Sequence, residues 1–127
     1  LGVPELVLWR APTDNDRGRA LIPLRGHDRE TISEADAWEA AELPRLLTRL
    51  VSVAATRDAV EIETRVGPAA YDWAARVRIR YTSDGSALGM SVRVDPIGEW
   101  PCTWARDGLS FRLPFEPTAR WRGRGPG

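Results

Sequence analysis

The sequence predicts an all-β fold, built from antiparallel strands with one short helix. The segment "ARVRIRY" (75–81) alternates strictly between apolar and basic residues, which is the period of a strand with one buried and one solvated face. The turn "SDGS" (83–86) leads into a second alternating segment, "GMSVRV" (89–94). Strands and helices do not alternate along the chain, which argues against a parallel sheet. We therefore expect an antiparallel meander with one solvated face.

The N-terminal part of the chain predicts a strand, a long loop and the helix. Residues 3–9 are mostly apolar and indicate a strand, whereas residues 11–30 are polar and aperiodic and indicate a loop. A loop of that length commonly carries a function. The segment "TISEADAWEAAE" (31–42) is the helical candidate, with Ser33 as its capping residue and Pro44 as its end.

From residue 46 onward the apolar period is two, which predicts further strands. Glu61 and Glu63 are expected to face the arginine row of the 75–81 strand, since opposite charges on neighbouring strands attract each other. Apart from the two alternating segments already named, the expected strands are 46–54, 60–66, 108–114 and 119–125.

The apolar side chains of these strands are expected to share one face of the sheet. A second layer must cover that face, because a single sheet leaves its apolar side in water. Either the chain folds over itself, or polypeptide outside the chain supplies the layer. The expected inward set is Val77, Ile79, Tyr81, Met90, Val92, Val94, Leu109, Phe111 and Leu113.

Composition limits the classes of partner and compartment. Of the 127 residues, 43% are apolar and 28% are charged with a formal net charge of zero, which argues against a nucleic acid or an anionic membrane as partner. No apolar run is long enough for a membrane span. The single Cys102 allows no intrachain disulfide, and the single His27 allows no Cys/His zinc cluster. A reducing, cytoplasmic location is therefore expected.

The polar stretch "LWRAPTDNDRG" (8–18) is the first candidate for a site. The stretch does not match a calcium-binding EF-hand loop. If Asp14 is the first position of that loop, Gly18 stands at the fifth, where an oxygen ligand is needed, and Arg25 at the twelfth, where a glutamate is needed. As a glycosidase carboxylate pair, Asp14 and Asp16 have a permissive spacing if the backbone is extended, but any Asp-x-Asp has it.

A turn is the simplest interpretation of the same stretch, since Asn and Asp bond their own backbone. Its neighbours nevertheless suggest more than a turn. Trp9 offers a flat apolar face of the kind on which sugars stack. Asp14 and Asp16, if buried, need a charge partner, and the nearest candidates are Arg10 and Arg17.

The chain holds six tryptophans, and core packing is the expected use of most of them. Trp100 and Trp104 flank Pro101 in an irregular segment and are also candidates for an interface or a sugar platform. Cys102 has no partner base nearby in the sequence and is expected to behave as a small buried apolar side chain.

Several segments together resemble a known family. "WRAPTDNDRG" (9–18) resembles the signature that begins the small-chain, or fifth, domain of bacterial β-galactosidases of glycoside hydrolase family 2. Four later segments resemble that family's motifs in the same order, so the resemblance covers nearly the whole chain. They are "AWEAAELPRL" (37–46), "YTSDGSALGMSVRV" (81–94), "ARDGLSFRLP" (105–114) and "ARWRGRGPG" (119–127).

The resemblance implies a fold and a place in a larger enzyme. The family's fifth domain is an antiparallel β-sandwich of the supersandwich, galactose mutarotase-like type, and residues 1–127 would be its N-terminal half, cut from something longer. The catalytic glutamates lie on a separate TIM barrel of the same polypeptide, so no catalytic residue is expected here. No metal or cofactor is expected in this chain either, and any Mg²⁺ or Na⁺ that the parent enzyme needs would belong chiefly to the barrel.

One functional element carries over from the family. A loop that starts at the glycine after Asp-Asn-Asp borders the active site there and moves as substrate binds. In this chain it would run from Gly18, as hinge, to about Gly26, with Asp14, Asn15 and Asp16 anchoring its base through hydrogen bonds and an ion pair. Arg10 completes the expected substrate-adjacent set.

The sequence therefore supports two hypotheses about function. In the first, the chain is a non-catalytic accessory part of a retaining β-galactosidase that hydrolyses terminal β-D-galactosides such as lactose. Its partners would be the barrel and the galactoside, and the chain excised from its parent would self-associate through an uncovered sheet. In the second, it is a carbohydrate-binding or purely structural β-sandwich whose parent lacks that activity.

Overall fold

The computed structural model describes residues 3–18 and 32–112, which form two antiparallel sheets and one α-helix. The predicted all-β antiparallel class with one short helix is confirmed. The elements are β1 (Glu5–Val7), a 3₁₀ turn η1 (Asn15–Arg17), α1 (Glu34–Ala40), a 3₁₀ turn η2 (Leu43–Arg45), β2 (Leu47–Ala55), β3 (Ala59–Gly67), β4 (Ala74–Ser83), β5 (Leu88–Ile97) and β6 (Gly108–Ser110).

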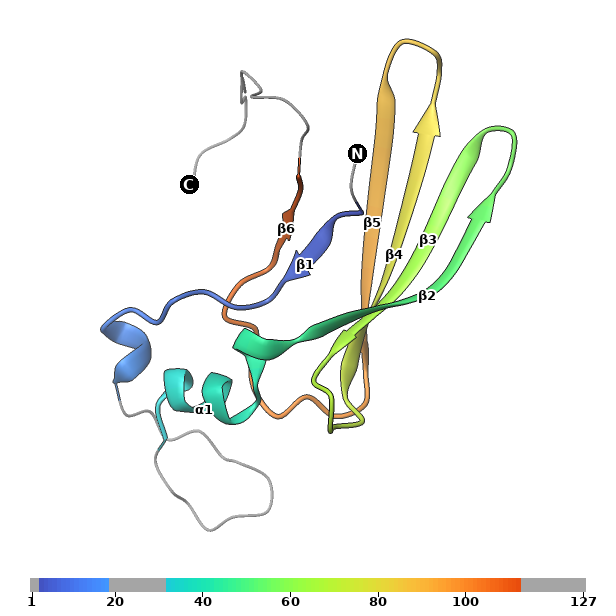
Figure 1. Cartoon of the computed structure of the whole chain (residues 1–127). Helices are drawn as coiled ribbons and strands as arrows, with labels where there is room; N and C mark the ends of the chain where they lie inside the picture. The colour runs from blue at the N-terminus through green and yellow to red at the C-terminus, as the bar shows by residue number, and fades with distance from the viewer. Residues whose placement is uncertain (1–2, 19–31, 113–127) are drawn as a thin grey trace.

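The larger sheet is the predicted meander, with strands in the order β2-β3-β4-β5 (Figure 1). All four expected strands form, and their ends differ from the predicted ends by three residues or fewer. The register places Glu61 opposite Arg80 and Glu63 opposite Arg78. Glu61 pairs with Arg80 at 3.6 Å and Glu63 with Arg76 at 3.3 Å, as the alternating charges predicted. Because exposed ion pairs contribute little, the buried face sets this register.

The smaller sheet, β1 paired with β6, supplies part of the required second layer. Leu6 and Leu8 pack into one cluster with Val77 and Ile79 of the larger sheet, so the two layers share a core. The strand predicted at 3–9 is only three residues long, because its pairing with β6 ends at Val7, opposite Gly108. The strand predicted at 108–114 ends at Ser110 within the described residues, and the one predicted at 119–125 lies outside them.

The helix is shorter than predicted at both ends. Ser33 is its N-cap, as expected, and its hydroxyl accepts the backbone N–H of Asp36 at 3.1 Å. The helix therefore begins at Glu34 rather than at residue 31. It ends at Ala40 because Glu42 takes a left-handed backbone (φ 55°), after which Pro44 lies in the first turn of η2.

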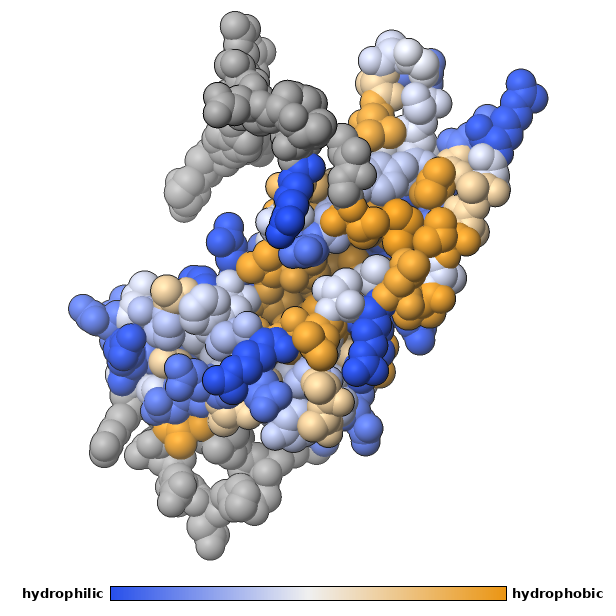
Figure 2. All heavy atoms as spheres, viewed as in Figure 1, coloured by the Kyte–Doolittle hydropathy of each residue, from blue (hydrophilic) through white to orange (hydrophobic). Residues whose placement is uncertain are grey.

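Much of the apolar face of the larger sheet is uncovered among the described residues. β1 and β6 have three residues each against nine or ten in β2–β5, so they cover only part of it. Figure 2 shows apolar atoms gathered over these strands. Met90 (38% exposed) and Phe111 (46% exposed) were expected to be buried in a core and are not, since nothing described covers them. Leu50 and Val53 on β2 are more exposed still.

We predict that the isolated chain self-associates through this face. Val53→Lys should lower the apparent mass in concentration-dependent light scattering, because a charge within an apolar contact is costly. Ser52→Lys is the matched control, since Ser52 lies beside Val53 on the opposite, polar face of the strand. A monomer at every concentration, or an equal effect of the two variants, would contradict the prediction.

Candidate functional site

The segment that follows β1 folds around one ion pair. The guanidinium of Arg10 donates two hydrogen bonds to the carboxylate of Asp16, Nη1 to Oδ2 at 2.6 Å and Nη2 to Oδ1 at 2.8 Å. The 3₁₀ turn η1 brings Asp16 back toward Arg10, and only 13% of the Asp16 side chain remains exposed. A bidentate, partly buried pair holds its geometry better than a fully exposed pair does.

Thr13 completes the shell around Asp16. Its backbone N–H and its hydroxyl both donate to Asp16 Oδ2 at 2.7 Å. The hydrogen bond from Arg10 holds the pKa of the Asp16 carboxyl well below its usual range, and the two bonds from Thr13 lower it further. The same contact raises the pKa of Arg10. Asp16 is therefore a fixed anion and is unsuited to act as a general acid, which needs a raised pKa.

Arg10 also joins this segment to two others. Its Nε donates to the carbonyl of Ala105 at 3.0 Å, and its guanidinium carbon lies 5.2 Å from the ring centre of Trp38 on α1. One side chain thus links the N-terminal segment, the helix and the chain that follows β5. Neither contact is visible as a local sequence pattern.

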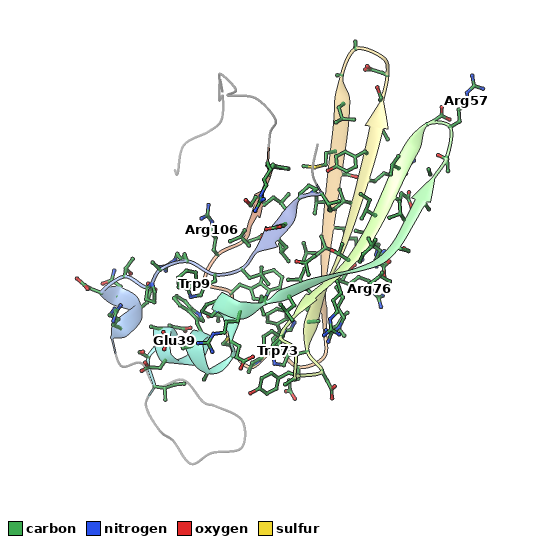
Figure 3. All side chains as sticks on the ribbon, viewed as in Figure 1. Trp9, Glu39, Arg57, Trp73, Arg76 and Arg106 are labelled. Atoms are coloured by element: carbon green, nitrogen blue, oxygen red, sulfur yellow. The ribbon has the colours of Figure 1, made fainter. Side chains whose placement is uncertain are left out.

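The tryptophans beside this site are packed together. The ring centres of Trp73 and Trp100 lie 4.5 Å apart, and those of Trp100 and Trp104 lie 5.4 Å apart. Trp100 also donates its indole N–H to the carbonyl of Ala74 at 3.1 Å. Figure 3 places Trp9 and Trp73 at the end of the molecule where α1 lies. Trp100 and Trp104 thus take part in packing, as predicted, but both stay partly exposed, and their use as an interface or sugar platform stays a prediction.

The other residues predicted for the site play smaller parts. Asp14 is exposed, makes no capping bond with its side chain, and accepts the N–H of Arg17 only through its carbonyl, at 3.2 Å. Asn15 likewise accepts the N–H of Gly18 through its carbonyl, at 3.3 Å. Gly18 has an extended backbone (φ −62°) that any residue adopts. Within the described segment, Asp16 alone supplies the carboxylate of the expected ion pair. Residues 19–26 of the expected loop lie outside the described part of the chain.

The contact of Thr13 with Asp16 was not predicted from the sequence, although the sequence contains a pattern that indicates it. Thr13 and Asp16 have the Thr-x-x-Asp spacing of a capping box, in which the acidic side chain reaches back to a backbone N–H three residues earlier. That spacing predicts the second set of hydrogen bonds to Asp16.

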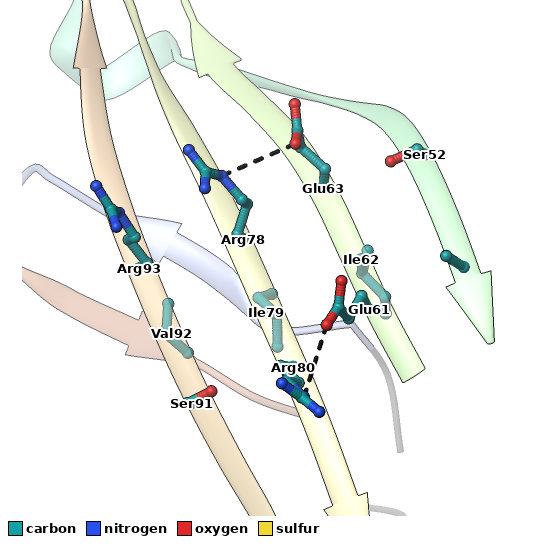
Figure 4. A pocket seen from close by; sticks show the side chains of 11 residues that line it. Ser52, Glu61, Ile62, Glu63, Arg78, Ile79, Arg80, Ser91, Val92 and Arg93 are labelled. Atoms are coloured by element: carbon teal, nitrogen blue, oxygen red, sulfur yellow. Dashed lines mark ion pairs between the residues drawn. The ribbon is translucent and has the colours of Figure 1, made fainter. Parts of the chain in front are cut away.

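A second concave region lies on the polar face of the larger sheet, with a volume of 440 Å³ (Figure 4). Its charges are largely paired with one another, as in the contacts of Glu61 with Arg80 and of Glu63 with Arg78. Arg93 pairs with Asp95 at 2.8 Å and lowers the pKa of that carboxyl. This face of the sheet is therefore a solvated surface whose opposite charges pair with one another.

Other classes of site find little support among residues 3–18 and 32–112. No group of three potential ligands from His, Cys, Asp and Glu comes together there to hold a metal ion. None of the helices in that part of the chain is long and apolar enough to cross a membrane. Cys102 is half-buried, and burial, with the charge of Glu34, raises the pKa of its thiol to about 11.

Comparison with known proteins places this geometry in a family. A family model described as the β-galactosidase small chain matches residues 2–127. The chain belongs to the β-galactosidase small-chain family. A β-galactosidase from Arthrobacter sp. (strain B7) is 31% identical over 132 aligned residues, which cover 97% of this chain and 13% of that protein. This chain thus spans about an eighth of that relative's length, and the predicted resemblance to the β-galactosidase small-chain domain is confirmed.

We predict that Asp16 stabilises the small-chain segment at neutral pH and loses this effect in acid. Its pKa in the folded state lies below the unfolded value of about 3.9, so the stabilisation is present above that value and is lost as the pH falls toward the folded pKa. The difference in Tm between wild type and Asp16→Asn should be largest near pH 7 and shrink below about pH 5.

The matched control for this measurement is Asp14→Asn, because the Asp14 side chain makes no capping bond. Its Tm should follow that of wild type at every pH. A difference between wild type and Asp16→Asn that stays constant from neutral to acid pH would show that the charge of Asp16 is not what stabilises the segment.

Proposed function

We propose that this chain is the N-terminal half of the small-chain domain of a retaining β-galactosidase, in which it serves as a non-catalytic accessory part. The observation that carries the proposal is the bidentate pair of Arg10 and Asp16 inside the family's opening signature. Support comes also from the matched relative, a β-galactosidase of which this chain spans 13%. The catalytic barrel and its glutamates would lie elsewhere in the same polypeptide.

The whole enzyme would hydrolyse terminal β-D-galactosides such as lactose in the cytoplasm. Any Mg²⁺ or Na⁺ it needs would be bound chiefly by the barrel. In this chain the role would be structural: the ion pair of Arg10 and Asp16 would hold the base of a loop that borders the active site. A loop held at its base can help to position a substrate.

The direct test is hydrolysis of a panel of nitrophenyl β-glycosides by the full-length parent, with the 127-residue chain as control. We expect selective cleavage of the galactoside by the parent and none by the isolated chain. Activity of the isolated chain would contradict the non-catalytic role. A parent that cleaves no galactoside would favour the alternative, a carbohydrate-binding or structural β-sandwich.

We predict that Gly18→Ala in the full-length enzyme changes kcat and KM together, because Gly18 would be the hinge of the loop. An added Cβ would meet only the carbonyl oxygen of Asn15, at 3.3 Å, so the base itself should tolerate alanine with a small adjustment. An effect on turnover would then reflect lost backbone freedom. Unchanged kinetics would remove the hinge role.

A further inference from the structure

One end of the polar face of the larger sheet carries three arginines side by side. The register pairs Arg49 of β2 with Arg65 of β3, and it pairs Arg65 in turn with Arg76 of β4. Residues paired in this way lie on the same face of a sheet, and neighbouring strands are about 4.8 Å apart. We call these three residues the cross-strand arginines. Figure 3 labels Arg76 and so shows where they lie on the sheet.

The described carboxylates nearest to the cross-strand arginines are already shared. Asp95 of β5 stands opposite Arg76 in the register. Its carboxylate, however, is bound by Arg78 and Arg93, at 2.8 Å each. Glu63 does reach Arg76, at 3.3 Å, but it also lies 3.9 Å from Arg78. Two carboxylates therefore contact three arginines between them.

The other two cross-strand arginines have no carboxylate partner among residues 3–18 and 32–112. Arg65 donates from Nη2 to the backbone carbonyls of Tyr71 and Asp72, at 3.4 and 3.2 Å, and a carbonyl does not neutralise its charge. Arg49 is exposed and makes no hydrogen bond or ion pair within those residues. Like charges opposite each other on neighbouring strands destabilise a sheet. The described residues thus leave this repulsion uncompensated.

The far end of the same face is balanced, and the contrast locates the excess charge. There Glu61 pairs with Arg80 at 3.6 Å (Figure 4), and the positions on either side of them in the register are uncharged. The paired positions of the whole face hold six arginines and three carboxylates, namely Arg49, Arg65, Arg76, Arg78, Arg80 and Arg93 against Glu61, Glu63 and Asp95. The chain as a whole is neutral, so this excess is a local feature.

We propose that the cross-strand arginines bind an acidic segment of the parent polypeptide that lies outside residues 1–127. A guanidinium binds a carboxylate through paired N–H donors, so three of them in line fit a segment with several aspartates or glutamates. The chain spans 13% of the β-galactosidase that it matches, so most of that relative's length lies outside the matched region. The proposal rests on the proposed function only in that it places the chain within a larger polypeptide.

The open surface around the cross-strand arginines favours a segment over other anions. The 440 Å³ concave region of the same face is lined by other residues. Exposed ion pairs contribute little one at a time, so a small anion would be held weakly, whereas several carboxylates on one segment act together. A nucleic acid fits less well, because its binding needs a basic field and the net charge of this chain is zero.

The first test is carbodiimide coupling in the full-length parent, which joins a lysine amine to a carboxylate in contact with it. The chain contains no lysine, so Arg49→Lys introduces its one lysine side chain. We expect mass spectrometry to find position 49 joined to an aspartate or glutamate outside residues 1–127. Arg57→Lys is the matched control and should form no such link, because Arg57 is exposed at the other end of β2, in the turn before β3 (Figure 3).

Three results of this coupling experiment would overturn the proposal. They are no coupling at position 49, coupling there only to carboxylates within residues 1–127, and equal coupling of the two lysines to the rest of the parent. The last result would show that exposure alone, and not a docked acidic segment, brings a carboxylate to the lysine.

The second test uses the sign of a charge reversal. If nothing acidic docks, Arg49→Glu replaces a repulsion of Arg65 by an attraction, and amide exchange in β2 should become slower. If an acidic segment docks, the new glutamate repels it. Exchange in β2 should then become roughly two- to fivefold faster at low salt, with a smaller change at high salt. Slower or unchanged exchange would overturn the proposal.

Neither measurement depends on galactosidase activity, so the two proposals can fail separately. A parent that cleaves no galactoside would contradict the proposed function, and the coupling and exchange results would still decide whether the cross-strand arginines bind an acidic segment.

Discussion

The guanidinium of Arg10 is the contact on which the helical end of the molecule depends. The Arg10 side chain meets the carboxylate of Asp16, the carbonyl of Ala105 and the ring of the buried Trp38. Its N–H groups donate to two segments, the residues just after it and Ala105, and its face lies against the third, the helix. Lysine could not reproduce these contacts, since an ammonium lacks the planar fork that binds both carboxylate oxygens while Nε donates to a carbonyl. One side chain therefore contacts both the N-terminal turn and the helix.

The larger sheet could be predicted from the sequence because its evidence is local and repeated. Because arginines alternate strictly with Val77 and Ile79, only one orientation of this strand buries the apolar side chains and leaves the arginines in water. The glutamates on the neighbouring strand alternate in the same way, so they face the arginines. The direction in which Met90 points also follows from that period. Its exposure does not, because exposure depends on how long the covering strands are, and β1 and β6 turn out to be short.

The candidate site was predictable only in part, for a related reason. A polar, Gly-containing segment with Asp, Asn and Arg indicates a turn and a charge pair, and both are present. The choice of Arg10 over Arg17 depends on the direction in which the 3₁₀ turn points Asp16, which no residue pattern specifies. The contacts with Ala105 and with the ring of Trp38 join residues far apart in sequence, so they could not be found before the fold was known.

Cys102 has a practical consequence for labelling this chain. Burial and the charge of Glu34 raise the pKa of the Cys102 thiol to about 11, so less of it is thiolate at neutral pH than in an ordinary cysteine. Thiol reagents react with the thiolate, so a maleimide dye or spin label should modify the native cysteine slowly. A cysteine introduced on an exposed strand such as β2 would be modified far faster. A probe placed there would leave Cys102 in its packing against the cluster of Trp38 and Trp73.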